Sequence, residues 1–340
     1  MTEDEIIHNL SVILSASTSL STGSVEGRNE RCHPERSRRV ILGIGDDAAV
    51  WQPSRSHRSV ISTDMLVEGV HFERTTMSLE DAGWRAMAAA LSDLAAMGAR
   101  PVLATVALGV PAANGSVEIL ELYKGIAASA RRFKIAIAGG DLSRSDIVTI
   151  SVTVVGEVRP SRTKTRAGAR PGDVLAVTGE LGAARAGLEV ANKPGLLKDA
   201  GGDAALRAFR RPAPRIAEGR FLAASANVTA MMDISDGLST DAQRLCARSE
   251  CGAEIETIPV ADSACELAKL LGEDPARFAL AGGEDFELLV AVRARSFRYL
   301  AGRYEKRFKR KLLRVGSLQR GRGVMWRGAP LDSVGWDHFA

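Results

Sequence analysis

The sequence predicts a two-domain protein of the α/β (α+β) class, and three observations carry that expectation. The chain has 340 residues, which at roughly 150 residues per domain indicates two domains. Short runs rich in β-branched residues alternate with segments whose apolar side chains follow helical spacing. A polar stretch over residues 159–173 interrupts this alternation and is typical of a domain junction.

The first 39 residues are predicted to stand apart from both domains. Residues 3–14 have apolar side chains spaced for a short amphipathic helix. Residues 15–39 are rich in Ser, Thr, Gly, Asn, Arg and Glu. Such a composition buries too little apolar surface to order a segment. We therefore expect residues 1–39 to form a helix followed by a mobile insertion.

The first domain is predicted over residues 40–160, with the element order β-β-α-β-α-β. Asp81 is expected in the N-cap region of its first helix, and Gly98 is the expected stop. The strand that starts at residue 135 is expected to run into a glycine turn. The strand segments are 40–51 (two strands around a glycine turn), 59–72, 102–110, 135–141 and 147–158, and the helices are 81–97 and 115–133.

The second domain is predicted over residues 161–340 and alternates strands with helices. Residues 192–205 are expected to form a loop rich in Gly, Lys and Asp, and residues 278–292 a turn between two apolar runs. The strands are expected within 173–179, 229–237, 253–260 and 312–318, and the helices at 181–191, 215–226, 238–250, 264–271 and 297–308.

Composition excludes several classes of protein. A content of 45% hydrophobic and 25% charged residues is globular and excludes a wholly disordered or collagen-like chain. The longest uncharged apolar stretch, 101–113, is shorter than the ~20 residues of a membrane helix, and the acidic N-terminus does not resemble a signal peptide. The four cysteines form no C-x-x-C pair, so we expect reduced thiols, a cytoplasmic location and no membrane contact.

Arginine clusters at 28–39 and 303–314 raise the alternative of a nucleic-acid-binding protein. The net charge is only +4, and aromatic residues make up 5% of the chain, which argues against a stacking surface for single strands. We therefore expect no nucleic-acid partner.

Four short motifs share one design, in which an apolar strand is followed by small residues and then by carboxylates. Glycines let the backbone approach a ligand and expose N–H groups to phosphate. Carboxylates need cations between themselves and a phosphate, and Mg²⁺ suits such a site because it prefers oxygen ligands. Each turn alone is also typical of ordinary surface loops. The motifs are GIGDD (43–47), IAGGD (137–141), DISDG (233–237) and AGGEDFE (281–287), and STD (62–64) and LSD (91–93) add further Asp residues.

Familiar catalytic signatures are missing from the sequence. It has no GxxxxGK[ST] phosphate loop, no protein-kinase HRD and DFG pair, and no convincing Ser-His-Asp arrangement. Among the five histidines, His71 alone lies near the acidic motifs, and a lone histidine is more often structural. Any phosphoryl transfer would therefore depend on positioning and metal ions, with no side chain as base or nucleophile.

The chain resembles the thiamine-monophosphate kinase family over about residues 40–340. The resemblance rests on GIGDDAAV, STDMLVEGVHF, LSDLAAMGARP, IAGGDLSRS, TRAGARPGD, DISDGLSTD, AGGEDFELL and the closing GWDHF. It implies the two-domain aminoimidazole ribotide synthetase-like fold. It also implies ATP-dependent phosphorylation of thiamine monophosphate to thiamine diphosphate, with several Mg²⁺ ions and direct in-line transfer. The resemblance further implies a homodimer whose N-terminal sheets join into a barrel, and an active site between the domains.

The resemblance also implies roles for single residues, carried over by match to the family motifs. Thr63 would act on a metal through its carbonyl, and Arg166 would pair with a phosphate. The implied metal ligands are Asp47, Ser62, Thr63, Asp64, Asp93, Asp141, Asp233 and Asp236. The implied ATP contacts are Tyr123, Gly140, Asp141, Arg166 and Ser235. The implied contacts to thiamine phosphate are His71, Glu287 and Trp336. Whether Glu284 or Asp285 shares the role of Glu287 is left open.

Two other members of the superfamily and one unrelated class are the alternatives. A selenophosphate synthetase should carry a reactive Cys with a nearby Lys, and Cys32 has no such neighbour. A hydrogenase maturation protein should end in Cys, whereas this chain ends in Ala340. A non-catalytic RNA- or partner-binding protein would rest on the arginine clusters and leave the acidic motifs unexplained.

Overall fold

The computed structural model divides the chain into two compact units. The N-terminal unit comprises residues 1–94 and 100–157, and the C-terminal unit comprises residues 95–99 and 158–340. The structure describes residues 5, 9–10, 40–42, 48–113, 115–196, 199–333 and 335. Of the helix expected over 3–14, the three described residues are helical, and the insertion expected at 15–39 lies outside the described residues.

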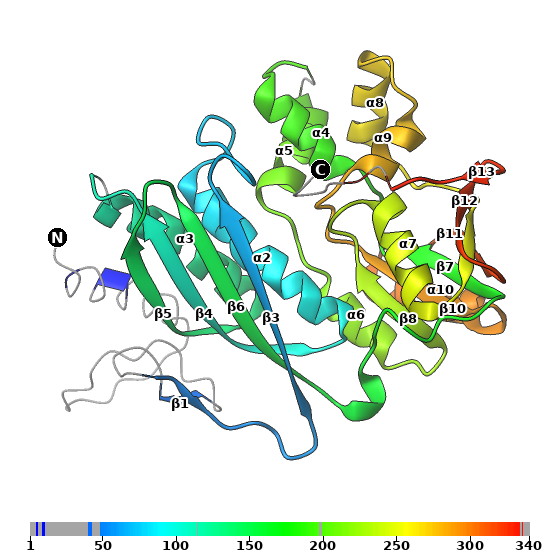
Figure 1. The fold of residues 1–340 in the computed structure, drawn as a ribbon, viewed down its shortest axis with the longest axis horizontal. Coiled ribbons are helices and arrows are strands. Elements are labelled where there is room, and N and C mark those ends of the chain that lie inside the picture. The colour runs from blue at the N-terminus through cyan, green and yellow to red at the C-terminus, as the bar shows by residue number, and fades with distance from the viewer. Residues whose placement is uncertain are drawn as a thin grey trace. The chain divides into compact units, whose positions relative to one another are not determined.

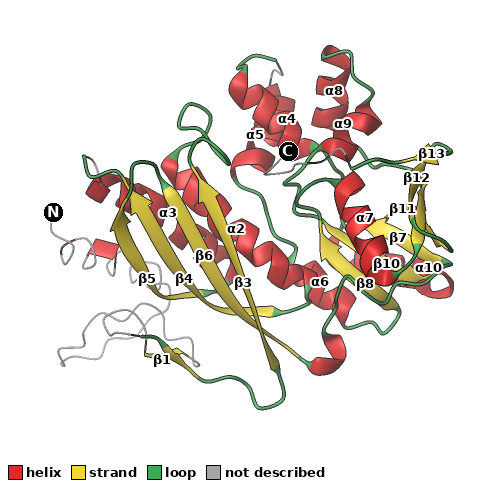
Figure 2. Cartoon of the chain, viewed as in Figure 1, coloured by secondary structure: helices red, strands yellow, loops and turns green. Residues whose placement is uncertain are grey.

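The N-terminal unit is built on a four-stranded sheet with helices against one face (Figures 1 and 2). Its strands lie in the order β3-β6-β4-β5, and β4 pairs in parallel with β5 and antiparallel with β6. In a short antiparallel pair, β1 and β2, the side chains of Val40 and Trp51 pack on Val102, Leu103 and Ala138. The elements are β1 (Val40–Leu42), β2 (Val50–Trp51), β3 (Arg58–Val67), α2 (Leu79–Ala96), β4 (Arg100–Val110), α3 (Gly115–Phe133), β5 (Ala136–Arg144) and β6 (Thr149–Val158).

Helices α2 and α3 pack against each other through glycines. A Cβ on Gly83 would lie 2.1 Å from the carbonyl oxygen of Leu122, and one on Gly125 would lie 1.7 Å from that of Glu80. Only glycine permits this backbone contact. Asp81 lies in the first turn of α2, in the N-cap region as predicted. The Ser78 hydroxyl accepts a hydrogen bond from the Asp81 N–H (3.1 Å) and donates one to the Asp81 carboxylate (2.9 Å), so Ser78 caps the helix.

The C-terminal unit is a seven-stranded sheet with helices on both faces. Its strand order is β13-β12-β9-β11-β7-β10-β8, mostly antiparallel, with β12 parallel to β9. The strands are β7 (Asp173–Val177), β8 (Val228–Asp233), β9 (Gly252–Ile255), β10 (Leu288–Arg293), β11 (Leu313–Gln319), β12 (Gly323–Trp326) and β13 (Ala329–Pro330). The helices are the 3₁₀ turn η1 (Pro160–Arg162), α4 (Ala183–Asn192), α5 (Asp199–Arg210), α6 (Ile216–Ala223), α7 (Leu238–Ser249), α8 (Asp262–Leu270), α9 (Pro275–Ala281) and α10 (Ala294–Phe308).

The central strands of this unit are buried on both faces. In β7, Leu175 and Val177 contribute to the core under α7, and Ala176 contributes to the core under α6 and α10. A strand covered on both faces has a continuous apolar run instead of an alternating one. This accounts for the run Leu288–Val292, which forms β10 between two cores.

Three predicted elements differ from the structure. Residues 139–141 form no turn, because β5 continues to Arg144 and Gly140 lies against β4, where a Cβ would meet the Val106 carbonyl oxygen at 1.9 Å. Part of the loop predicted at 192–205 belongs to α5, whose Ala205 and Phe209 are buried against the hollow left by Gly187 of α4. Packing overrides the low helix propensity of its glycines. The apolar run at 278–281 is the end of α9, which Asp274 caps.

Within the described residues, no helix is long and apolar enough to cross a membrane. The described cysteines Cys246, Cys251 and Cys265 are free, as expected, and the first two are buried.

Candidate active site

Three of the predicted metal ligands, Ser62, Asp64 and Asp93, meet in the N-terminal unit. Asp64 lies on β3 and Asp93 on α2, and the hydroxyl of Ser62 donates a hydrogen bond to the Asp93 carboxylate. Burial and the neighbouring charge of Asp93 raise the pKa of Asp64 to about 6. No Lys or Arg of the described chain forms an ion pair with either carboxylate. The pair therefore carries negative charge that nothing in the described protein balances.

Thr63 points away from this pair. Successive side chains of a strand alternate between the two faces of the sheet. The Thr63 hydroxyl accordingly bonds the hydroxyl of Thr153 on β6, 2.9 Å away, on the exposed face. Its predicted contact with a metal through the carbonyl stays a prediction.

Asp141 and Gly140 lie far from the pair within this chain. They belong to β5, at the opposite edge of the sheet from β3, so three strand spacings of ~4.8 Å separate Asp141 from Asp64 by roughly 14 Å. Asp141 is exposed. Among the described residues, no group of three His, Cys, Asp or Glu side chains could hold a metal ion together. The structure thus does not bring the full predicted ligand set together, and Asp47 lies outside the described residues.

His71 sits in a loop that an ion-pair network holds in place. The Val67 N–H donates to Nδ1 of His71 (3.1 Å), so the neutral ring carries its proton on Nε2. Arg74 bridges Glu68 (2.5 Å) and Glu118 (2.7 Å), and Glu68 also accepts from the Val148 N–H. The bridge of Arg74 to Glu68 and Glu118 was not predicted from the sequence, although Glu68 and Arg74 flank His71 in the VEGVHFER segment.

Tyr123 is buried in α3 with 4% of its surface exposed, and burial raises its pKa to about 12. A contact with ATP was predicted for this side chain, and its place in the core counts against that role within one chain. The contact stays a prediction.

In the C-terminal unit, the DISDG and GGEDFE segments pair through their backbones. The Glu284 N–H donates to the Ser235 carbonyl (2.7 Å), and the Phe286 N–H donates to the Ile234 carbonyl (3.0 Å). Glu284 and Phe286 have φ values of +64° and +49°, a left-handed conformation that L-residues rarely adopt. Asp233 is buried at the end of β8, and Ser235 and Asp236 are half-buried in the turn after it. The two motifs therefore form one joint structure.

Asp241, which was given no role from the sequence, fixes the turn formed by residues 233–237, called here the acidic turn. It is fully buried on α7, and its carboxylate accepts from the N–H groups of Ser235 (3.1 Å) and Asp236 (3.0 Å). Arg244 donates to Asp241 (3.0 Å) and to Asp236. The signal for this function was the third acid of DISDGLSTD, Asp241, placed in the first turn of the predicted helix.

Glu287 is engaged with the protein itself. It is 3% exposed, and it accepts hydrogen bonds from Thr178 (2.6 Å), from Arg215 (2.6 and 2.9 Å) and from Arg310 (2.9 Å). Burial disfavours its ionised form, but the charges of Arg215 and Arg310 outweigh burial and lower the pKa. Both oxygens therefore already have protein donors, which counts against a contact with a substrate; that contact stays a prediction.

Asp285 also serves the scaffold. Its carboxylate accepts from the N–H groups of Gly182 (2.7 Å) and Ala184 (3.3 Å) at the start of α4. Burial raises its pKa to about 7, although these N–H groups oppose the shift. Of the three acids in GGEDFE, Glu284 alone lies directly against the DISDG turn with a half-buried residue surface.

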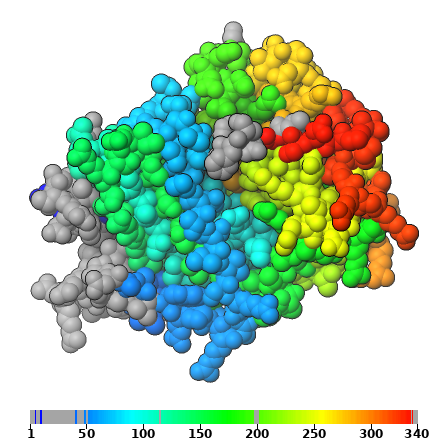
Figure 3. Space-filling model, in the orientation of Figure 1, coloured from blue at the N-terminus to red at the C-terminus, as the bar shows by residue number. Residues whose placement is uncertain are grey.

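The C-terminal tail runs over α7 and reaches the acidic turn. The Leu331 carbonyl accepts from Gln243, and the hydroxyls of Ser333 and Thr240 are 2.7 Å apart; in the space-filling view the red end of the chain lies against yellow α7 residues (Figure 3). A Cβ on Gly335 would lie 1.9 Å from the Asp236 carbonyl oxygen. Trp336 lies outside the described residues, but the residue before it is packed on the turn.

Arg166 lies beside β8, before the acidic turn. Its neighbour Thr165 accepts from the Met231 N–H (3.0 Å), and its own carbonyl accepts from the Ser249 hydroxyl (2.7 Å). The Arg166 side chain is exposed. The structure gives it access to solvent, and its contact with ATP stays a prediction.

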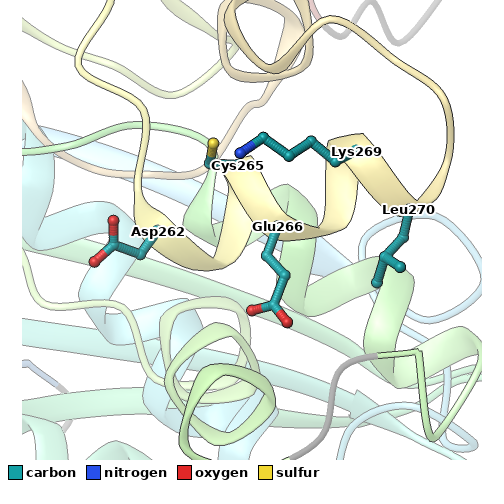
Figure 4. A pocket seen from close by; sticks show the side chains of 5 residues that line it. All are labelled: Asp262, Cys265, Glu266, Lys269 and Leu270. Atoms are coloured by element: carbon teal, nitrogen blue, oxygen red, sulfur yellow. The ribbon is translucent and has the colours of Figure 1, made fainter.

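A pocket of ≈ 420 Å³ lies on α8, away from these motifs in the sequence. Its lining side chains all come from this one helix: Asp262, Cys265, Glu266, Lys269 and Leu270 (Figure 4). It contains none of the predicted site residues. The lining mixes both signs of charge with apolar groups, so it shows no preference for one class of ligand.

Two family models match successive domains of the chain. The model of the AIR synthase related protein N-terminal domain matches residues 45–158, and that of the C-terminal domain matches residues 170–305. The hydrogenase maturation protein HypE shares the fold, with a TM-score of 0.71 at 19% identity.

Thiamine-monophosphate kinases are similar over most of the chain. The enzyme of Rhodopirellula baltica is 40% identical over 74% of this chain and 76% of its own length. The crystal structure from Stenotrophomonas maltophilia is 35% identical, with a TM-score of 0.78 over 86% of this chain and 93% of that one. The structure of AaThiL complexed with AMPPCP and TMP is 32% identical, with a TM-score of 0.75 over 87% of this chain and 92% of that one. The chain therefore belongs to the thiamine-monophosphate kinase family.

Proposed function

We propose that the protein transfers the γ-phosphoryl group of ATP to thiamine monophosphate and forms thiamine diphosphate. The observation that carries the proposal is the uncompensated pair Asp64 and Asp93, which needs a cation of the kind that accompanies ATP. Family membership supports the same chemistry, since a relative of known structure is complexed with AMPPCP, an ATP analogue, and TMP.

The residues present fit Mg²⁺, because the available donors are carboxylate and hydroxyl oxygens. Bound Mg²⁺ would neutralise the phosphate groups that must approach each other. Asp64, Asp93 and Ser62 would hold it in the N-terminal unit, and Asp233 and Asp236 in the C-terminal unit. Asp47, Thr63 and Asp141 complete the ligand set that the resemblance implies.

The chain's own residues position the substrates. The Nε2–H of His71 is the proton that the ring can donate to a phosphate, since Nδ1 accepts from the backbone. The acceptor atom is a phosphate oxygen that is already ionised, so the transfer needs no strong base. The described turns contain no Cys or Lys nucleophile, which favours direct in-line transfer.

For thiamine monophosphate, we assign Glu284 the contact first predicted for Glu287. Glu284 lies on the acidic turn, whereas Glu287 orients Arg215 and Arg310. Trp336 would supply an aromatic contact, because the residue before it is packed on Asp236.

We also propose a homodimer and a cytoplasmic location. Ile61 and Met65 on the edge strand β3 are 70% and 54% exposed, an unusual surface for a monomer. A second copy of the sheet would cover them, and it would supply an Asp141 from outside the chain that holds Asp64. Light scattering should give twice the chain mass of 36.1 kDa, and a monomeric mass would contradict the dimer. Free buried thiols suit a reducing compartment.

The test of function is an assay of the purified full chain with ATP, Mg²⁺ and thiamine monophosphate. Thiamine diphosphate and ADP should appear in equal amounts, and unphosphorylated thiamine should not replace the acceptor. The absence of thiamine diphosphate under these conditions, with a folded protein, would refute the proposal.

A further inference from the structure

Arg244 forms a cationic bridge at the acidic turn of the C-terminal unit. On α7, its Nη1 donates to one carboxylate oxygen of Asp236 and to one of Asp241, the latter at 3.0 Å. The Asp241 side chain is fully buried, and the side chains of Asp236 and Arg244 are 24% and 41% exposed. The guanidinium thus reaches the turn from solvent and can leave it without opening the core.

The bridge supplies what the turn needs when no metal is present. Asp241 fixes the turn through the N–H groups of Ser235 and Asp236, and this places two carboxylates close together. Like charges at such a distance repel each other unless a cation lies between them. Arg244 is that cation in the structure described here.

The same oxygen of Asp236 cannot serve a guanidinium and a metal ion equally well. Asp236 is also one of the proposed Mg²⁺ ligands. A Mg²⁺ ion demands near-ideal octahedral geometry from its oxygen ligands, and a guanidinium on one of them obstructs it electrostatically.

We infer that Arg244 is a built-in counter-ion of the acidic turn, which occupies Asp236 in the metal-free protein and must release it before Asp236 takes a metal ion. This inference rests on the proposed function, because it assumes that Asp236 is a metal ligand. After release, Arg244 keeps its bond to Asp241, so the turn stays anchored. Arg244 therefore sets how tightly the enzyme binds its ion.

The test is a titration of the nucleotide-free full-length protein with Mn²⁺ as the probe, followed by electron paramagnetic resonance of the free ion. Arg244→Gln should bind Mn²⁺ about fivefold more tightly than wild type, which corresponds to loss of one part-exposed ion pair. The matched control is Arg314→Gln, which removes an arginine of similar exposure on β11 from its pair with Glu256, and it should leave the affinity unchanged.

A second pair of variants locates the effect at Asp236. In the Asp236→Asn background, Arg244→Gln should no longer change Mn²⁺ affinity, because the competition needs the carboxylate. In EDTA, Arg244→Gln should melt at a lower temperature than Arg314→Gln, and added Mg²⁺ should restore more of its stability than that of wild type.

Weaker or unchanged Mn²⁺ binding by Arg244→Gln would overturn the inference. Arg244 would then increase the affinity for the ion or have no effect on it. Identical Mn²⁺ binding by wild type and Asp236→Asn would remove Asp236 as a ligand and the inference with it. The phosphorylation assay distinguishes this failure from failure of the proposed function, because it does not depend on which acids hold the ion.

Discussion

Similar acidic motifs have opposite surroundings in the two units of the molecule. In the N-terminal unit, Asp64 and Asp93 lie together, and the described part of that unit offers them no cation. In the C-terminal unit, the acids of the two paired turns have protein donors: Asp236 has Arg244, Asp285 has backbone N–H groups, and Glu287 has two arginines and a threonine.

The difference distinguishes carboxylates that can bind a cation from carboxylates that stabilise the fold. A carboxylate whose charge is balanced by the protein stabilises the fold and offers little to a ligand, whereas an unbalanced pair destabilises the empty protein and attracts a cation. We therefore expect removal of charge to lower stability at Glu287, whose charge the protein balances, and to raise it at Asp64, whose charge it does not.

The largest expected effect is in the C-terminal unit. Glu287→Gln should lower the free energy of unfolding at pH 7 by about 3 kcal/mol, because it removes the buried carboxylate that compensates Arg215, which is 19% exposed, and Arg310, which is 36% exposed. The pKa of Glu287 is lowered in the folded state, so its contribution is present above the unfolded pKa and lost as pH falls through the lower folded value. Urea unfolding at pH 7 and at pH 3.5 should show the loss shrinking in acid.

The control for this prediction is Glu256→Gln, which breaks the exposed pair with Arg314 and should cost about 0.5 kcal/mol. Equal losses for the two variants would show that burial of Glu287 is not what makes its pairing important.

In the N-terminal unit, the sign should reverse. Asp64→Asn should raise the stability of the metal-free protein by about 1 kcal/mol, because it removes a buried charge and its repulsion with Asp93. It should also lower kcat for thiamine diphosphate formation by about 100-fold, since a ligand to the ion is lost. Melting in EDTA and steady-state kinetics measure the two effects. A less stable variant with normal turnover would break the comparison between the units.

The smallest effect concerns Asp285, whose carboxylate has backbone N–H donors but whose pKa is raised by burial. Its folded pKa of about 7 exceeds the unfolded value of 3.8, so its favourable contribution is complete below 3.8 and lost as pH rises toward 7. Asp285→Asn keeps an oxygen for Gly182 and Ala184 and has no charge to bury. Relative to wild type, its free energy of unfolding should rise by roughly 1.3 kcal/mol from pH 5 to pH 6, because each pH unit between the two pKa values is worth about 1.4 kcal/mol. If the difference in free energy of unfolding between Asp285→Asn and wild type stays constant with pH, the helix N–H groups hold the pKa of Asp285 near its normal value.

The sequence predicted regular elements best where packing and local preference agree. The helix at 115–133 has the predicted bounds, and the β-branched runs at 102–110 and 149–158 are strands. Prediction failed where contacts between distant segments decide the conformation. The glycines of α5 argue against a helix, and only its packing on α4 reverses that preference. The glycines at 139–140 are typical of a turn, but β4 holds them in a strand.

By itself, the sequence determined the family and the fold class, and it predicted which acids carry the chemistry, because strand-glycine-acid motifs are local patterns. Only the tertiary structure decided which of those acids are free to bind. The donors to Glu287 lie 23 to 109 residues away, at Arg310, Arg215 and Thr178, and the Asp93 that raises the pKa of Asp64 comes from another element. Charge and hydrogen bonding act through distances of a few ångströms in space, and those distances exist only once the chain has folded.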